Sequence, residues 1–314
     1  MPKKTISKFS SFVIAAAACA VTFSACTPGF KGKGPIDIGN DGKSDDYGAA
    51  RVVGEIESKE INESSGVAAS RCQPGVFWTH NDSGDGPYIY AFDEKGRTLG
   101  TWRVSGAENV DWEDIAATSD CRLYIGEIGN NELKRSRMIV YRINEPRLNG
   151  SESASSRTAP LETEQAFPIA FSYADGPHDA EALMVHPKSG DIYVLSKSRK
   201  DASGVYRIPH DAKGETSAVR IGEISLPAIP DGLVTGGDIS PDGKRVILCD
   251  YFLAYELKLA DESRGFDSIW KSRPLAIDLP ERKIGEAIGY SADGRAIYAT
   301  SEKLSSPVIR VDRR

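Results

Sequence analysis

The sequence has little positive charge, few cysteines and no apolar run long enough to cross a membrane as a helix. Lysine and arginine number 39 against 45 aspartate and glutamate residues, which gives a net charge of −6. The first 25 residues hold three lysines and no acid, so the rest of the chain is more acidic still. Nucleic-acid binding needs clustered lysine and arginine, so we expect no nucleic-acid partner.

The N-terminal apolar run, Phe12 to Ala20, follows a basic segment and is too short for a membrane span. Together with the small residues Ser24 and Ala25 it describes a secretory signal. The Cys26 that follows resembles the lipobox of bacterial lipoproteins, with Phe23 where leucine is commoner. This resemblance implies export, a lipid on the Cys26 thiol and anchoring to a membrane, the outer one in a diderm organism. An ordinary signal peptide with an incidental cysteine is the alternative.

Three segments follow from composition: a signal peptide over 1–25, a flexible tether over 26–49 and one globular domain over 50–314. The tether is rich in Gly, Asp, Lys and Ser. Its segment Asp37 to Asp46 offers oxygen ligands for calcium but lacks the closing glutamate of an EF-hand loop, so we interpret it as a linker. The size of the remaining domain is normal for a closed all-β ring, and we expect a monomer.

A small-then-aliphatic step recurs along this domain at intervals of 48 to 68 residues, which is the sequence mark of a repeat architecture. Its five copies are Gly66-Val67-Ala68, Asp114-Ile115-Ala116, Ala182-Leu183-Met184, Asp238-Ile239-Ser240 and Ala287-Ile288-Gly289. After each copy come an apolar run and then an alternating segment, such as Val76–Trp78 and Ile89–Phe92 in the first unit. Alternation of this kind between Gly, Asp and Asn predicts strands.

A fourth strand is expected in four of the units, and the last unit lacks one because the chain ends at Arg314. A spare strand stands at the front instead, since Arg51 to Glu57 is nearly the same string as Val219 to Ile224. Four-stranded units arranged radially form a β-propeller. We therefore predict an all-β, five-bladed propeller whose last blade is completed by the N-terminal strand.

Turns and insertions fit this scheme. The pairs Asp242-Gly243 and Asp293-Gly294 stand between first and second strands, where a hairpin needs a positive φ. Cys72 and Cys121 occupy the same turn of adjacent units, so a disulfide between them is within reach, and an exported compartment permits it. Cys249 ends an apolar strand and is expected to be a buried thiol. The one sizeable insertion, residues 144–165, is interpreted as a long exposed loop of unknown use.

Acidic residues are predicted to gather at one mouth of the central channel. The first strand of each blade begins on the rim where the second strand ends, so residues at both places meet there. The candidate metal ligands are Glu63, Asp111, Glu113, Glu181, Asp238 and Glu286, with Asp179, Lys197, Tyr251 and Glu302 nearby. Converging acids raise one another's pKa values unless a cation lies among them, and hard oxygen ligands favour calcium. For any one acid, a role in capping loop amides is the alternative.

Four residues are candidates for catalysis: His80, Asp82, Glu127 and His178. His80 and Asp82 are spaced to form an acid–base pair, but the string from Asn81 to Gly86 is also typical of an ordinary turn. The serines near the first anchor have no Gly-x-Ser-x-Gly setting, so a serine nucleophile is not expected.

The repeated acid-x-Glu-small-aliphatic step resembles exported bacterial propellers of the phytase-like, or esterase-like, group. More loosely, the Ser240-Pro-Asp-Gly243 turn is similar to that of the gluconolactonase–regucalcin–paraoxonase group. That second resemblance implies a calcium ion held by Glu63 and Asp238, although the Asn-Gly expected before a later first strand is absent. Two functions stay open. One is an anchored module that binds a cation and a small-molecule or cell-envelope ligand; the other is a calcium-dependent hydrolase of esters, lactones or phosphates.

Overall fold

The structure is a computed structural model that describes residues 42–198, 201–211, 214–227 and 233–314. The chain separates into two units, Met1–Gly34 and Pro35–Arg314, and all described residues belong to the second. The predicted signal peptide, Cys26 and most of the tether therefore lie outside the described residues. Within the described part, no helix is both long enough and apolar enough to span a membrane.

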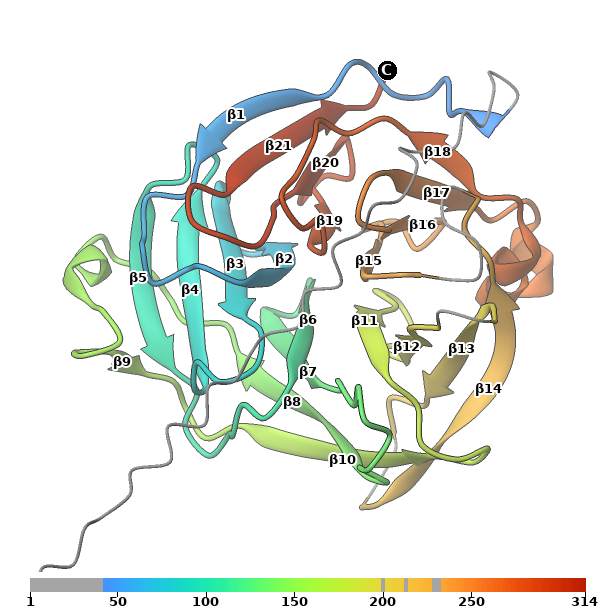
Figure 1. The fold of residues 1–314 in the computed structure, drawn as a ribbon, viewed down its shortest axis with the longest axis horizontal. Helices are drawn as coiled ribbons and strands as arrows, with labels where there is room; N and C mark the ends of the chain where they lie inside the picture. The colour runs from blue at the N-terminus through green and yellow to red at the C-terminus, as the bar shows by residue number, and fades with distance from the viewer. Residues whose placement is uncertain (1–41, 199–200, 212–213, 228–232) are drawn as a thin grey trace, which may run out of the picture. The chain divides into compact units, whose positions relative to one another are not determined.

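Strands form four sheets that are arranged radially around a centre (Figure 1). The first holds β2 (Ser64–Ala69), β3 (Val76–Asn81), β4 (Tyr88–Asp93), β5 (Thr98–Arg103) and the short β9 (Leu161–Glu162). The next has eight strands: β6 (Trp112–Thr118), β7 (Arg122–Glu127), β8 (Met138–Asn144), β10 (Phe167–Tyr173), β14 (Thr216–Ile224), β13 (Ser203–Ile208), β12 (Ile192–Ser196) and β11 (Ala180–Val185). The third is formed by β15 (Gly236–Ile239), β16 (Arg245–Cys249), β17 (Ala254–Lys258) and β18 (Leu275–Ile277). The last contains β19 (Ile288–Tyr290), β20 (Ala296–Ala299), β21 (Pro307–Asp312) and β1 (Arg51–Glu55).

The innermost strands make a closed ring, since β2 contacts β6, β6 contacts β11, β11 contacts β15, β15 contacts β19, and β19 returns to β2. The eight-stranded sheet spans two repeat units, which are joined where the outer strands β10 and β14 pair in parallel. The N-terminal strand β1 pairs antiparallel with β21, with Arg51 opposite Arg310 and Glu55 opposite Pro307. The all-β propeller architecture and the predicted closure by the N-terminal strand are therefore confirmed.

Local sequence explains why these strands form. The second strand of each unit is apolar because both of its faces are covered, as in β16, where all five residues are buried. The turns between first and second strands use glycine in the left-handed region, with φ of 73° at Gly243 and 68° at Gly294. In both turns the preceding aspartate accepts hydrogen bonds, Asp242 from Ser240 Oγ and Asp293 from Ser291 Oγ. The turn prediction is confirmed.

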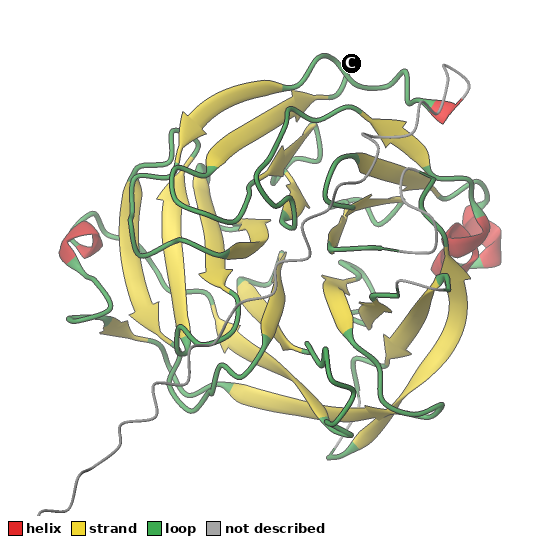
Figure 2. Ribbon diagram, viewed as in Figure 1, coloured by secondary structure: helices red, strands yellow, loops and turns green. Residues whose placement is uncertain are grey.

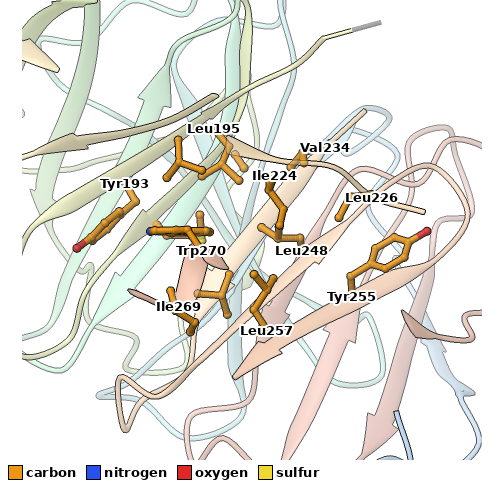
Figure 3. Close-up of a cluster of buried hydrophobic side chains, with 14 of the residues drawn as sticks. Tyr193, Leu195, Ile224, Leu226, Val234, Leu248, Tyr255, Leu257, Ile269 and Trp270 are labelled. Atoms are coloured by element: carbon orange, nitrogen blue, oxygen red, sulfur yellow. The ribbon is translucent and has the colours of Figure 1, made fainter. Parts of the chain in front are cut away.

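The hydrophobic core lies between neighbouring sheets rather than in one central mass. In the cluster of Figure 3, Tyr193 and Leu195 of β12 pack with Leu248 of β16 and with Trp270. The Tyr193 and Trp270 rings lie 5.9 Å apart between centroids. Trp270 belongs to a short 3₁₀ helix, Phe266–Lys271, one of the few helical turns among the described residues (Figure 2). The apolar seams between sheets hold the inner strands at fixed spacing around the channel.

The end of the predicted tether is not a free linker. Lys43 forms an ion pair with Asp278, and Asp46 forms one with Lys258, both at 2.7 Å. Tyr47 is 4% exposed and donates a 2.6 Å hydrogen bond to the buried Glu256. The packed domain therefore begins before residue 50, because an aromatic side chain and two ion pairs hold this segment against the last two sheets.

The insertion over 144–165 is largely exposed, as expected, but it is anchored to the first sheet. Its Glu145 is 7% exposed and accepts a 2.8 Å hydrogen bond from the indole Nε1 of the buried Trp78. A 3₁₀ turn at Glu152–Ala154 packs beside β5, and strand β9 pairs parallel with β5. The insertion thus covers the outer strand of the first sheet, where it protects an otherwise open edge.

A disulfide joins Cys72 and Cys121, with their Cα atoms 5.6 Å apart. Each cysteine lies in the turn after a first strand, β2 or β6, and these two strands are neighbours in the ring. Cys249 is a buried thiol, and burial raises its pKa to about 12. At that pKa the thiolate is scarce at neutral pH, so Cys249 is chemically inert.

Candidate metal centre

One rim of the ring collects the starts of the innermost strands and the ends of the second strands. Trp112 at the start of β6 lies opposite Glu127 at the end of β7, and Ser64 of β2 lies opposite Asn81 of β3. Ala180 of β11 and Ser196 of β12 are paired in the same way. We call this rim the mouth. Its residues come from segments far apart in the chain, as the hairpin geometry of a propeller requires.

A β-bulge interrupts the pairing at three of these entries. The register shifts between Ser64 and Gly66, between Trp112 and Asp114, and between Ala180 and Ala182. The extra residue in each bulge is therefore Ser65, Glu113 or Glu181. A bulge turns a side chain out of the normal alternation, and bulges are common beside functional sites. The recurring acid-x-Glu step thus has a structural basis, because its glutamate is the bulged residue.

Five carboxylates meet at the mouth in two overlapping groups. Asp82, Asp111 and Glu113 form one group, and Glu113, Asp179 and Glu181 form the other. Within each group, one ligand atom from every residue lies within 4.8 Å of the others. Glu113 and Glu181 are 4% and 3% exposed, respectively, and the other three are half-buried. Such a set of hard oxygen donors suits a divalent cation such as calcium.

The surroundings leave room for these carboxylates. A Cβ atom at Gly129 would lie 2.1 Å from Oε1 of Glu113 and 2.5 Å from Cγ of Asp111, so a larger residue there would displace these two carboxylates. The next residue, Asn130, donates its backbone N–H to Asp179 at 2.7 Å. On the other side, Nζ of Lys197 lies 2.6 Å from Oε1 of Glu181. The ammonium of Lys197 therefore offsets part of the negative charge of the cluster.

Burial and mutual repulsion raise the pKa values of these acids. Burial, with Asp111 and Glu181 as neighbours, raises the pKa of Asp82 to about 7. Burial, then Asp179 and Glu181, raises the pKa of Asp111 to about 6. The pKa of Glu113 lies well above its ordinary value for the same two reasons, and that of Glu181 is raised although Lys197 opposes the shift. A cation among the carboxylates would offset both effects.

Glu286 and Glu63 lie in a second acidic group across the mouth, with Glu302. Glu286 accepts a hydrogen bond from Ser65 Oγ at 3.2 Å, and burial, then Glu181 and Glu302, raises its pKa well above the ordinary value. Lys303 lies 3.3 Å from Glu302 and 3.8 Å from Glu63. Neither of the two three-residue ligand groups found among the described residues includes Glu286 or Glu63. These acids line the mouth but stand apart from the carboxylate cluster.

Asp238 is placed differently from the sequence expectation. Its Oδ2 accepts from Arg71 at 3.0 Å and from the backbone N–H of Tyr290 at 2.9 Å, so it links β15 to β19. Asp114 has the same role in the second unit: its Oδ2 accepts from the N–H groups of Leu183 and Gly237, at 2.9 and 3.2 Å. Both stand at the first position of the small-aliphatic step, one residue deeper than the bulged glutamates. Facing inner strands leave unpaired N–H groups, and these two carboxylates satisfy them.

Two of the four catalytic candidates have structural roles. His80 is fully buried, its Nδ1 lies 2.9 Å from the carbonyl oxygen of Asn81, and burial lowers its pKa to about 4. Among the described residues no hydrogen bond joins it to Asp82. Glu127 accepts from the N–H groups of Val110 and Asp111 and pairs with Arg135 at 2.5 Å. It holds the loop that carries Asp111.

His178 and Asp82 are half-buried. Asp82 belongs to the carboxylate cluster, as described above. His178 lies on the loop before β11 and contacts Asp175 and the hydroxyl of Tyr206 through Nε2. It lines a cavity of about 450 Å³ that also contains Asp179 and Lys197 in its wall.

Sequence reasoning places Asp111, Glu113 and Glu181 together but gives no reason for Gly129 or for the bulges. The signal for Asp179 is present, since Asp179-x-Glu181 repeats Asp111-x-Glu113. No comparable repeat points to Gly129 in the sequence. Its role is visible only in the structure, where a Cβ atom at this position would collide with the carboxylates.

Comparison with known proteins finds only distant similarity. No protein-family model matches the chain, and a search of curated proteins finds no match. Similar solved structures include a gluconolactonase from Xanthomonas campestris (10% identity, 87% of this chain and 92% of that one, TM-score 0.49). Others are a PQQ-bound aldose sugar dehydrogenase from Streptomyces coelicolor (11%, 85% and 98%, 0.47) and a chain of a nidogen–laminin complex (15%, 77% and 73%, 0.42). Likeness at this level carries no argument about activity.

Proposed function

We propose that this protein is a propeller that binds a divalent cation, calcium in the first place, at the carboxylate cluster of its mouth. The observation that carries the proposal is the pair of ligand groups that share Glu113. Five acids from three consecutive repeat units meet there, and the ammonium of Lys197 contacts one of them, Glu181. The raised pKa values of Asp82, Asp111, Glu113 and Glu181 give the site a thermodynamic reason to take up a cation, because bound calcium would stabilise the ionised forms.

The cation would serve to hold a small-molecule or cell-envelope ligand. The hydrolase alternative requires a proton acceptor close to the cation, and His80 and Glu127 are occupied by structural contacts. Asp82, which belongs to the cluster itself, and His178 are the candidates that remain. With no assembled nucleophile and base at the cluster among the described residues, binding is the function that the geometry supports best.

We also infer the setting of this function from the sequence. Cleavage before Cys26 and lipidation of its thiol would place the propeller at a cell-envelope membrane, with residues 27–41 as the spacer. Counting the eight-stranded sheet as two blades gives five blades, in agreement with five repeats of the small-aliphatic step. The acidic charge supports a monomer that does not bind nucleic acid.

A calcium titration tests the proposal. We expect the melting temperature of the metal-free soluble domain to rise with calcium, since a ligand that binds only the folded state stabilises it by about 2.7 kcal/mol at 100 times its Kd. Glu113→Gln and Glu181→Gln should each weaken calorimetric calcium binding. Glu132→Gln is the matched control, because Glu132 is an exposed acid of a mouth loop that pairs only with Lys134. If millimolar calcium leaves the wild-type melting curve unmoved, there is no cation site.

A further inference from the structure

A cavity of about 450 Å³ adjoins the carboxylate cluster on the side of β11 and β13. Asp179 and Lys197 belong to both the cavity wall and the mouth. Leu133 and Pro177 give the cavity an apolar wall, while His178 and Tyr206 give it a polar one. A molecule bound there would therefore lie next to the proposed cation.

Asp175 fixes the protonation pattern of the His178 ring. Its Oδ1 lies 2.9 Å from Nε2 of His178, and its Oδ2 accepts a 2.9 Å hydrogen bond from the Tyr206 hydroxyl. Burial opposes ionisation of Asp175, but the hydrogen bonds from His178 and Tyr206 hold its pKa below the ordinary value. An ionised carboxylate can only accept, so Nε2 of His178 carries the hydrogen. In the neutral ring Nδ1 is then a lone-pair acceptor.

Packing holds this ring in place. The Tyr173 ring meets the His178 ring edge-on, with centroids 5.1 Å apart, and the Tyr206 ring lies at the same distance on another side. The Tyr206 hydroxyl oxygen is also 2.7 Å from Nε2. No hydrogen bond to Nδ1 is formed by any residue that the structure describes. An imidazole with one nitrogen anchored and the other unpartnered in a cavity wall is built to receive a donor.

We propose that this cavity is a ligand pocket for a small molecule that donates a hydroxyl hydrogen to Nδ1 of His178. The proposal deepens the proposed function, since a neighbouring oxygen of the same molecule would complete the coordination of the cation.

The chemistry of the wall favours a hydroxyl group. The two cationic side chains that the structure describes in the wall are already paired, Lys197 with Glu181 at 2.6 Å and Arg220 with Glu223 at 3.0 Å. A hydroxyl matches the acceptor at Nδ1, and calcium readily takes a hydroxyl oxygen as a ligand.

Modification of histidine by diethyl pyrocarbonate, followed residue by residue with mass spectrometry, tests the proposal. The chain has four histidines, and the exposed His210 serves as the internal reference. We expect His178 to react, and sorbitol with calcium to slow its reaction at least tenfold without protecting His210. Inorganic phosphate and ethylammonium, used as charged probes, should not protect it. Protection by phosphate alone, an inert His178, or no protection by sorbitol would each overturn the proposal.

Variants separate this pocket from the cation site. His178→Asn should weaken calorimetric sorbitol binding at least tenfold and leave calcium binding unchanged, whereas His210→Asn should change neither. Asp175→Asn should also weaken sorbitol binding, because an amide can donate to Nε2 and move the ring hydrogen to Nδ1. If the wild type does not bind calcium, only the cation site is refuted. Whether sorbitol protects His178 in the absence of calcium then decides for or against the pocket. Unchanged sorbitol binding in His178→Asn refutes the pocket even when calcium binds.

Discussion

At the mouth, acidic residues that differ by one position within the repeated step have different roles. Glu113 and Glu181 are bulged and reach the carboxylate cluster, whereas Asp114 and Asp238 stand one position further along the repeated step and face the neighbouring inner strands. The sequence shows acids at both positions, so the pattern alone does not separate ligands from structural acceptors. For this reason the pattern groups Asp238 with the metal ligands, although its carboxylate is occupied by Arg71 and the amide of Tyr290.

The raised pKa values of Asp82 and Asp111 predict how calcium binding depends on pH. Both are acids whose folded-state pKa, about 7 and about 6, lies above the ordinary value of 3.8. Without metal, stability is therefore highest below about pH 4 with respect to these groups and is lost as the pH rises through 6 and 7. Calcium needs the ionised forms, so its stabilising effect should grow over the same window.

We expect the calcium-induced rise in melting temperature to be larger at pH 8 than at pH 5 by about 4 °C or more, which corresponds to about 1–2 kcal/mol in a domain of this size. Differential scanning calorimetry at the two pH values checks this. Asp82→Asn should flatten the pH dependence. A calcium effect that is equal at both pH values would contradict the assigned pKa shifts.

Asp114 offers a prediction about stability alone. Asp114→Ala leaves the buried N–H groups of Leu183 and Gly237 without an acceptor, and each unsatisfied buried amide costs about 1–3 kcal/mol. We expect the free energy of unfolding to fall by about 2–5 kcal/mol, measured by urea denaturation. Asp120→Ala is the control, because Asp120 is an exposed residue of the turn after β6 that contacts Thr118 and Arg122, and its loss should change little. Equal stability of the two variants would show that Asp114 does not link the inner strands.

At the scale of strands, the repeat predicts the elements well because each strand is specified by its own alternation and turn. The alternating segment Ile89–Phe92 falls inside β4, and the fourth strand expected at Val219–Ile224 falls inside β14. The sequence analysis misses the anchoring of the insertion and of the segment ending at Tyr47 for a common reason. Both look polar along the chain, and each is anchored by a buried carboxylate on a partner far away in sequence, Glu145 with Trp78 and Glu256 with Tyr47. Period and composition carry no information about such single contacts.

The disulfide connects two neighbouring elements and should stabilise them through the unfolded chain. Cys72 and Cys121 are 49 residues apart, and closing a loop of that size is worth about 4 kcal/mol in the chain-entropy account. We expect the double variant Cys72→Ser, Cys121→Ser to lose about 2–4 kcal/mol of unfolding free energy. Reductant should destabilise the wild type to the same extent and leave the double variant unchanged. A response of the double variant to reductant would point instead to a reagent effect, because the remaining described cysteine, Cys249, is a buried thiol.

At the scale of the whole molecule, the carboxylate cluster depends on the closed ring, because no single sheet contains all of its residues. The carboxylates come from the β3–β4 loop and from the entries to β6 and β11, and these approach one another only when the inner strands close around the channel. A propeller without one of its sheet edges would therefore lose stability and its cation site together. This coupling cannot be predicted from one repeat, since each unit supplies only one or two ligands.

Closure by β1 gives the last prediction. Deleting Arg51–Glu55 removes the strand that pairs with β21 and leaves an open sheet edge, which favours edge-to-edge association. We expect the melting temperature to fall by at least about 8 °C, a loss of several kcal/mol, together with concentration-dependent oligomers in size-exclusion chromatography. A synthetic peptide of residues 42–57 added in trans should restore some of the stability, because it carries both the strand and the anchoring Tyr47. A scrambled peptide of the same composition is the control. An unchanged melting temperature after the deletion, or equal rescue by the scrambled peptide, would mean that the ring holds together without its N-terminal strand.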